Sequence, residues 1–131
     1  MLRTIGSTTE RQGIDLLGAG SPWGQIEFAG LIAEGISHVS TPSHGGLLLS
    51  EENNVKVPEE WRRQGGWYEE DCEWSIGFTF LRDEILAGED ERSKSVILDG
   101  TVERTLKRWY PAIHHSYYGF DGVVESIKGK S

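Results

Sequence analysis

Residue types able to do chemistry are concentrated in one stretch of this 131-residue chain, residues 38–74. It holds two of the four histidines, the single cysteine and three of the five tryptophans. The stretch begins with His38-Val39-Ser40-Thr41-Pro42-Ser43-His44-Gly45-Gly46 and ends with Gly66-Trp67-Tyr68-Glu69-Glu70-Asp71-Cys72-Glu73-Trp74. We expect any working face of the protein to be built from these two segments.

A metal site is one chemistry that these residues allow. His38 and His44 stand six residues apart across a turn, and the carboxylates of residues 70–73 complete a ligand set that suits zinc or non-haem iron. No recognised ligand spacing such as His-Glu-x-x-His is present, and both histidines also fit structural roles in the turn and the sheet. The sequence therefore predicts no cofactor, and it leaves a metal-assisted hydrolase using His38 and His44 as an alternative.

Nucleophilic and phosphate-binding chemistry has weaker support. Cys72 has acidic neighbours on both sides, and negative charge disfavours the thiolate that a nucleophile needs, so we expect a core residue. The glycines of residues 43–46 expose backbone N–H groups, but they match neither Gly-x-Ser-x-Gly nor a phosphate-binding Gly-Lys-Ser/Thr loop. Side chains of the turn are instead expected to bond to its backbone: Ser40, Thr41 and Ser43.

Negative charge is concentrated in the middle of the chain. The net charge is −8, and residues 51–91 carry 13 acidic against four basic side chains. Such a field repels nucleic acid and steers the protein toward basic partners, although acidic stretches of this kind are more often a plain solvated face that aids solubility. The predicted partner-binding residues, with the two tryptophans as anchors, are Glu59, Glu60, Trp61, Trp67, Glu69, Glu70, Asp71 and Glu73.

Length and composition predict a single domain of ordinary globular type. The chain is 37% hydrophobic and 26% charged, and no apolar run approaches the length that crosses a bilayer. A lone cysteine suits a reducing compartment, so we expect a cytoplasmic protein. We expect a flexible N-terminal lead-in over residues 1–21, one domain over residues 22–124 and a frayed tail over residues 125–131.

Alternating apolar residues predict a small antiparallel sheet. Residues 25–33 and 36–40 each alternate and are separated by Glu34-Gly35, which indicates a hairpin. Gly45-Gly46 turns the chain into Leu47-Leu48-Leu49, a third strand. The expected fold class is α+β, with an antiparallel sheet of three or more strands packed against two or three helices.

The helices are expected after the strands. Ser50 is a typical helix cap, and residues 58–63 indicate a short helical turn that begins at Pro58. Residues 67–81 show both periodicities, and helical spacing is favoured over a strand. A longer helix is expected from about residue 94 to residue 110, and the aromatic residues 113–120 should pack back on the domain.

The two segments also carry a resemblance. Val39-Ser40-Thr41-Pro42-Ser43-His44-Gly45-Gly46 and Gly66-Trp67-Tyr68-Glu69-Glu70-Asp71-Cys72-Glu73-Trp74 resemble the "VST-x-SHGG" and "GW-[YF]-EEDCEW" patterns of an uncharacterised domain family found in phage and plasmid-borne proteins. Trp23-Gly24 matches the start of that pattern, so the resemblance covers roughly residues 22–82. It implies a mobile-element setting, in which short acidic proteins often inhibit host defence systems.

The favoured hypothesis combines two observations, the negative charge of residues 51–91 and the resemblance to the phage and plasmid-borne family. It describes a phage or mobile-element protein, similar to anti-CRISPR proteins, that blocks a host defence complex by binding its basic nucleic-acid-binding surface. No direct nucleic-acid or membrane binding is expected. Besides the hydrolase, a structural or replication accessory protein without enzymatic activity is the remaining alternative.

Overall fold

A four-stranded antiparallel sheet organises the protein, which we describe from a computed structural model covering residues 11–119. Its strand order is β3-β4-β5-β6, and β1 and β2 form a separate two-stranded hairpin. The strands are β1 (Gly20–Ser21), β2 (Gly24–Gln25), β3 (Phe28–Ala33), β4 (Ile36–Ser40), β5 (Gly45–Leu49) and β6 (Trp67–Glu69). The predicted α+β class is confirmed, and the three predicted strands are joined by a fourth, β6.

The described residues contain six α-helices, where two or three were predicted. They are α1 (Glu51–Asn54), α2 (Trp74–Phe80), α3 (Arg82–Ala87), α4 (Glu91–Leu98), α5 (Thr101–Trp109) and α6 (Pro111–Tyr118). The helix expected over residues 94–110 is divided into α4 and α5 because Gly100 adopts a left-handed φ of 87°. The helix favoured over residues 67–81 is present only from Trp74 to Phe80; Trp67–Glu69 instead form β6, because they pair with β5 in the sheet.

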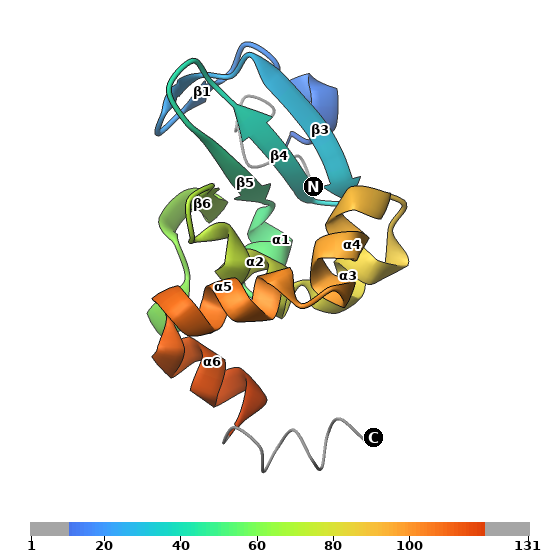
Figure 1. The fold of residues 1–131 in the computed structure, drawn as a ribbon. Helices are drawn as coiled ribbons and strands as arrows, with labels where there is room; N and C mark the ends of the chain where they lie inside the picture. Colours follow the sequence, from blue (N-terminus) through green and yellow to red (C-terminus); the bar gives the residue numbers. More distant parts are fainter. Residues whose placement is uncertain (1–10, 120–131) are drawn as a thin grey trace.

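Short 3₁₀ helices complete the chain: η2 (Gly13–Leu16), η3 (Glu59–Trp61) and η4 (Gln64–Gly66). Ser50 caps α1 as predicted, because its side chain accepts a hydrogen bond from the Asn53 N–H. Figure 1 shows the helices gathered at one end of the sheet, with α6 furthest from the strands. Residues 113–118 of the aromatic segment expected to pack back belong to α6, which packs on α5, and residue 120 lies outside the described residues.

Both faces of the sheet are covered, and each face has its own core. One core joins the sheet to the helices and includes Leu47, Leu49 and Tyr68. The other includes Leu16 and Leu48 and packs under the N-terminal segment. Because a strand buried on both faces needs no polar positions, the continuous run Leu47-Leu48-Leu49 fits this central strand.

Packing begins before residue 22, the predicted start of the domain. Leu16 is fully buried, the Gly13 N–H donates to Ser37 Oγ at 2.9 Å, and the Gly35 N–H donates to Gln12 Oε1 at 2.6 Å. Residues 12–21 are therefore part of the fold. The remainder of the predicted lead-in, residues 1–10, and the predicted frayed tail, residues 125–131, lie outside the described residues.

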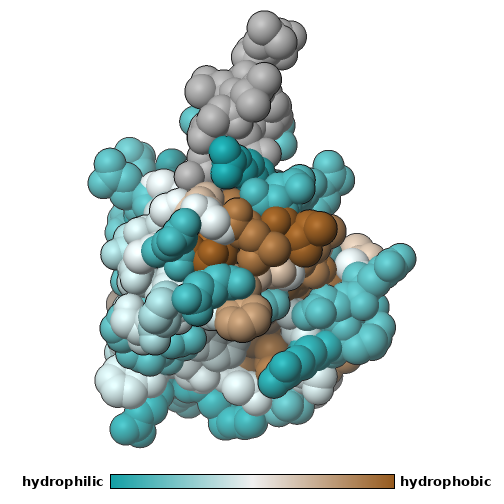
Figure 2. All heavy atoms as spheres, turned by 90° about the horizontal axis from the view of Figure 1, so that it is seen from above, coloured by the Kyte–Doolittle hydropathy of each residue, from teal (hydrophilic) through white to brown (hydrophobic). Residues whose placement is uncertain are grey.

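Figure 2 shows apolar side chains gathered on the face seen from above, where η2 and β3 lie in Figure 1. Large apolar side chains are exposed on η2, directly after it and on β3: Ile14, Leu17, Phe28 and Leu31. Among the described residues, no helix is both long and apolar enough to cross a membrane.

Candidate functional site

The two motif segments meet at one corner of the sheet. Strand β6 pairs with β5 so that Glu69 lies opposite Gly46, and the Glu70 N–H donates to the Gly45 carbonyl at 2.9 Å. His44 Nδ1 lies 3.5 Å from Glu69 Oε2. We call this region, residues 38–46 together with residues 67–74, the motif corner.

Of the three side chains predicted to bond to the backbone of the β4–β5 turn, only Thr41 does so. Thr41 Oγ1 accepts from the His44 N–H at 3.1 Å and donates to the His44 carbonyl at 2.7 Å. Ser43 Oγ donates to the Trp23 carbonyl at 3.2 Å, which ties the turn to the segment before β3. Ser40 takes no part in this network and instead lines a pocket described below.

Gly45 and Gly46 are explained by close packing. A Cβ at Gly46 would collide with the Tyr68 carbonyl and lie 2.6 Å from Trp23 Cη2. One at Gly45 would lie 2.7 Å from the Val39 carbonyl oxygen. Real Cβ atoms do not approach other atoms so closely, so both positions exclude larger residues. Turn structure accounts for this glycine pair without a bound phosphate.

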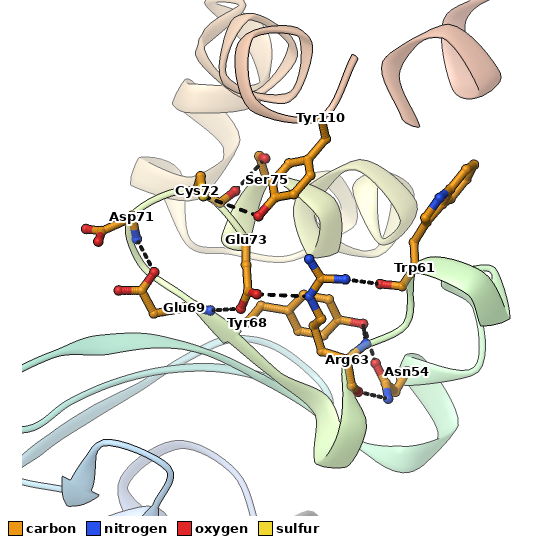
Figure 3. A network of polar contacts seen from close by, with 10 residues as sticks. All are labelled: Asn54, Trp61, Arg63, Tyr68, Glu69, Asp71, Cys72, Glu73, Ser75 and Tyr110. Carbon is orange, nitrogen blue, oxygen red and sulfur yellow. Dashed lines mark hydrogen bonds and ion pairs between the residues drawn. The ribbon is translucent and has the colours of Figure 1, made fainter. Parts of the chain in front are cut away.

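A buried hydrogen-bond network anchors the second segment to the end of α1 and to the loop that follows it (Figure 3). Tyr68 is fully buried, and its hydroxyl donates to Asn54 Oδ1 at 2.6 Å and accepts from the Arg63 N–H at 3.2 Å. Asn54 Nδ2 donates to the Arg63 carbonyl at 3.0 Å. Burial raises the pKa of Tyr68 above its ordinary value. These bonds fix β6 in the sheet.

Glu73 belongs to the same scaffold. Its Oε1 accepts from the Glu69 N–H at 3.0 Å and its Oε2 accepts from Arg63 Nε at 3.0 Å (Figure 3). Partial burial opposes the Arg63 charge, but the hydrogen bond and the negative charge of Glu73 raise the Arg63 pKa above its ordinary value. The predicted partner-binding role of Glu73 is not supported by this geometry, because its carboxylate is used inside the protein.

Cys72 contacts an aromatic hydroxyl. Its Sγ lies 3.2 Å from Tyr110 Oη, and the residue is half-buried where a core position was predicted (Figure 3). Burial, together with the neighbouring Cys72, raises the pKa of Tyr110 to about 12. The contact joins the motif corner to the end of α5.

Trp61 and Trp67, the two tryptophans predicted to anchor a partner, are both packed against other aromatic rings of the protein. Trp61 stacks on Phe80 with ring centroids 6.0 Å apart, and Trp67 meets Trp23 edge to face at 5.6 Å. Each tryptophan is half-buried against one of the two cores. Most of their surface therefore serves packing.

The acidic residues predicted to bind a partner fall into two groups: exposed side chains, and side chains that form hydrogen bonds within the protein. Glu69 is half-buried and accepts from the Asp71 N–H at 3.1 Å, and burial raises its pKa. Four of the predicted acidic side chains are exposed: Glu59, Glu60, Glu70 and Asp71. Glu59 and Glu60 lie on η3, whereas Glu70 and Asp71 follow β6 at the motif corner.

An open pocket of about 480 Å³ lies where the motif corner meets α2 and α4. The polar and glycine lining comes from His38, Ser40 and Gly46 of the first segment and from Glu70 of the second, which also contributes Trp74. The other lining residues are Ile32, Val39, Leu47, Phe78, Asp90, Arg92, Ser93 and Val96. The pocket thus joins polar groups of both segments to an apolar and aromatic surface.

Two glycines make room for the polar side chains of this pocket. A Cβ at Gly30 would lie 2.7 Å from His38 Nε2, so the imidazole lies over Gly30 on the neighbouring strand. A Cβ at Gly45 would lie 3.0 Å from Glu70 Oε1, so this carboxylate lies over Gly45. Neither side chain makes a hydrogen bond or ion pair with another of the described residues. Both are available to a ligand.

The ligand set expected for a metal is not brought together. His38 lines the pocket, His44 pairs with Glu69, and Glu73 is held by Arg63. Within residues 11–119 no group of three histidine, cysteine or carboxylate side chains is placed to hold a metal ion.

The sequence analysis did not predict that residues of α4 and its cap would line this pocket. Asp90 caps this helix by accepting from the Ser93 N–H at 3.1 Å and from the Ser93 hydroxyl. The Asp-x-x-Ser spacing is a recognisable helix start, but nothing in it indicates proximity to His38.

A second pocket of about 460 Å³ includes Glu59, Asn54 and Arg62 and no residue of either segment.

These features define the protein as an α+β domain. It has an open pocket where the two motif segments meet. The chain belongs to the family described as a domain of unknown function, DUF7007, whose family model matches residues 17–126. The expectation of an uncharacterised family is thus confirmed. A comparison with curated proteins gave no match, and neither did one with solved structures.

Proposed function

We propose that this protein acts by binding another protein and that the motif corner is its contact surface. The supporting observation is the convergence of the two segments, which leaves His38, Glu70 and Asp71 exposed beside an open pocket. Binding sites of this kind combine an apolar surface with a few polar groups that fix orientation.

The proposed partner presents a basic, nucleic-acid-binding surface. Glu70 and Asp71 add local negative charge to a chain of net charge −8, which favours association with such a surface. By the resemblance of its motifs, we propose a host defence complex as the target and the host cytoplasm as the site of action. The protein would then compete with nucleic acid as an acidic mimic, similar to anti-CRISPR proteins.

The decisive experiment reverses charge at the corner. Bacterial cells with an active CRISPR or restriction system are transformed with a targeted plasmid while they produce the protein or its variants. We expect the unmodified protein to restore transformation and the Glu70→Lys/Asp71→Lys variant to lose this effect, because like charges repel across an interface.

The matched control is Glu34→Lys/Asp15→Lys, which changes net charge equally. Glu34 lies in the β3–β4 turn at the other end of β4, and Asp15 lies on η2. Both side chains are exposed. This variant should still restore transformation. If the unmodified protein inhibits neither kind of system, or if the corner variant inhibits as well as the control, the proposed function is wrong.

A further inference from the structure

The pocket at the motif corner has carboxylates from two separate elements. Glu70 follows β6, and Asp90 stands at the start of α4. Asp90 caps α4 through Ser93 and remains a carboxylate, and Glu70 has no partner among the described residues. Arg92 is the one arginine or lysine among the described lining residues, so fixed charge at the pocket is net negative.

Aromatic and aliphatic side chains line the same pocket. Trp74 is half-buried and meets Phe78 edge to face, with ring centroids 5.1 Å apart. Val96 is half-buried and adds aliphatic surface, whereas Leu47 and Ile32 line the pocket as almost fully buried core residues. A ligand that fits must therefore pair a positive charge with an apolar or planar body. A phosphate or a simple carboxylate would meet Glu70 and Asp90 as like charges.

We infer that this pocket receives an arginine side chain from the partner protein. A guanidinium group pairs with a carboxylate through two parallel hydrogen bonds and stacks on tryptophan, and its methylene stem packs on aliphatic side chains. Glu70, Trp74 and Val96 supply these three surfaces in turn. The pocket volume of about 480 Å³ leaves room for the backbone that carries the arginine.

The inference rests on the proposed function, because it names what the motif corner recognises on a basic partner. It also explains polar side chains at the pocket that form no hydrogen bond or ion pair within the described part of the protein. His38 lies over Gly30 at the pocket wall, where a neutral imidazole nitrogen can accept a further guanidinium N–H. The network around Tyr68 holds β6, and so places Glu70, without contacting the ligand.

A titration of the full chain with N-acetyl-arginine amide, followed by two-dimensional NMR, tests the inference directly. We expect saturable shifts of the Trp74 indole N–H and of the Gly46 and Leu47 amides. The citrulline analogue has the same shape without the charge and should bind about ten-fold more weakly or not at all. The Glu70→Gln variant should weaken arginine binding about ten-fold as well.

Glu59→Gln is the matched control. It removes one exposed carboxylate that lines the other pocket, so arginine affinity should be unchanged. Titrations with inorganic phosphate and with N-acetyl-lysine amide complete the experiment. Equal binding of arginine and citrulline, shifts remote from Trp74, no effect of Glu70→Gln, or tighter binding of phosphate than of arginine would each overturn the inference. Lysine binding as tight as arginine binding would overturn the requirement for a guanidinium.

Failure of this inference is distinguishable from failure of the proposed function. If the protein restores transformation but binds no arginine probe, the motif corner binds its partner in another way. Only the inference that the pocket receives an arginine side chain is then wrong. If the arginine probe binds and Glu70→Lys/Asp71→Lys still restores transformation, the pocket stands and the proposed function falls.

Discussion

At the scale of single residues, neighbours in the second motif segment have opposite roles. Tyr68 and Glu73 point into the network that holds β6, whereas the Glu70 side chain makes no hydrogen bond or ion pair with a described residue and lines the pocket. The acidic run of residues 69–73 is therefore not one uniform charged face. Two of its carboxylates, those of Glu69 and Glu73, accept backbone N–H groups within the corner.

Tyr68→Phe should destabilise the fold by about 1–3 kcal/mol, because it leaves the buried Asn54 Oδ1 and the Arg63 N–H without their partner. Urea unfolding followed by tryptophan fluorescence measures the change. The Asn54→Ala/Tyr68→Phe double variant should lose less stability than the sum of the two single variants. Strictly additive losses would show that the hydrogen bond contributes nothing of its own.

At the scale of elements, tight approaches of strands and turns depend on glycine at particular positions. Gly66 precedes β6 with a φ of 84°, and a Cβ there would collide with the Leu49 carbonyl. This contact sets how closely the chain entering β6 approaches the end of β5. Register is fixed on the other side by the pairing of Leu47 with Tyr68.

Gly66→Ala should therefore cost at least about 2 kcal/mol of folding free energy, because alanine is strained at positive φ and has no space. Gly20→Ala is the matched control: nothing lies within 4 Å of its added Cβ and its φ is not positive, so its effect should stay within about 0.5 kcal/mol. Chemical denaturation of both variants compares them. Equal stability of the two would contradict the packing at the β5–β6 junction.

At the scale of the whole molecule, the sheet is a partition between two cores. The helices cover one face, and residues 12–26 cover the other. Ile14 and Leu31 remain exposed on this side of the sheet, whereas Phe28 is exposed on the face that also carries His38. The N-terminal segment thus contributes structure to the domain.

Leu16→Ala should lower the free energy of unfolding by about 2–5 kcal/mol, since Leu16 is fully buried in the second core. Its neighbour Leu17 is 49% exposed, so Leu17→Ala removes the same atoms at a far smaller cost. Thermal or urea unfolding of the pair gives the comparison. A small effect for Leu16→Ala would mean that residues before 22 are a lead-in after all.

Local signals in the sequence determined much of the fold. The alternation of residues 25–40, the Gly45-Gly46 turn and the Ser50 cap each act through bonds to near neighbours, and the corresponding strands and helix are present. Gly100 divided the expected long helix because one left-handed residue is enough to end helical hydrogen bonding. The early start of the domain escaped prediction because Leu16 is apolar within a polar segment, and only its partners across the sheet reveal its burial.

Only the tertiary structure decided the site. The pairing of β5 with β6 brings residues 46 and 69 together, and the packing of α4 brings Asp90 and Arg92 to the same pocket. The sequence identified His38, His44 and the acidic run as candidates without showing which of them meet. Spacing along a chain does not fix contacts between elements, because those depend on how apolar faces pack. Here that packing separates His38 from the His44–Glu69 pair and places it in the pocket with Glu70.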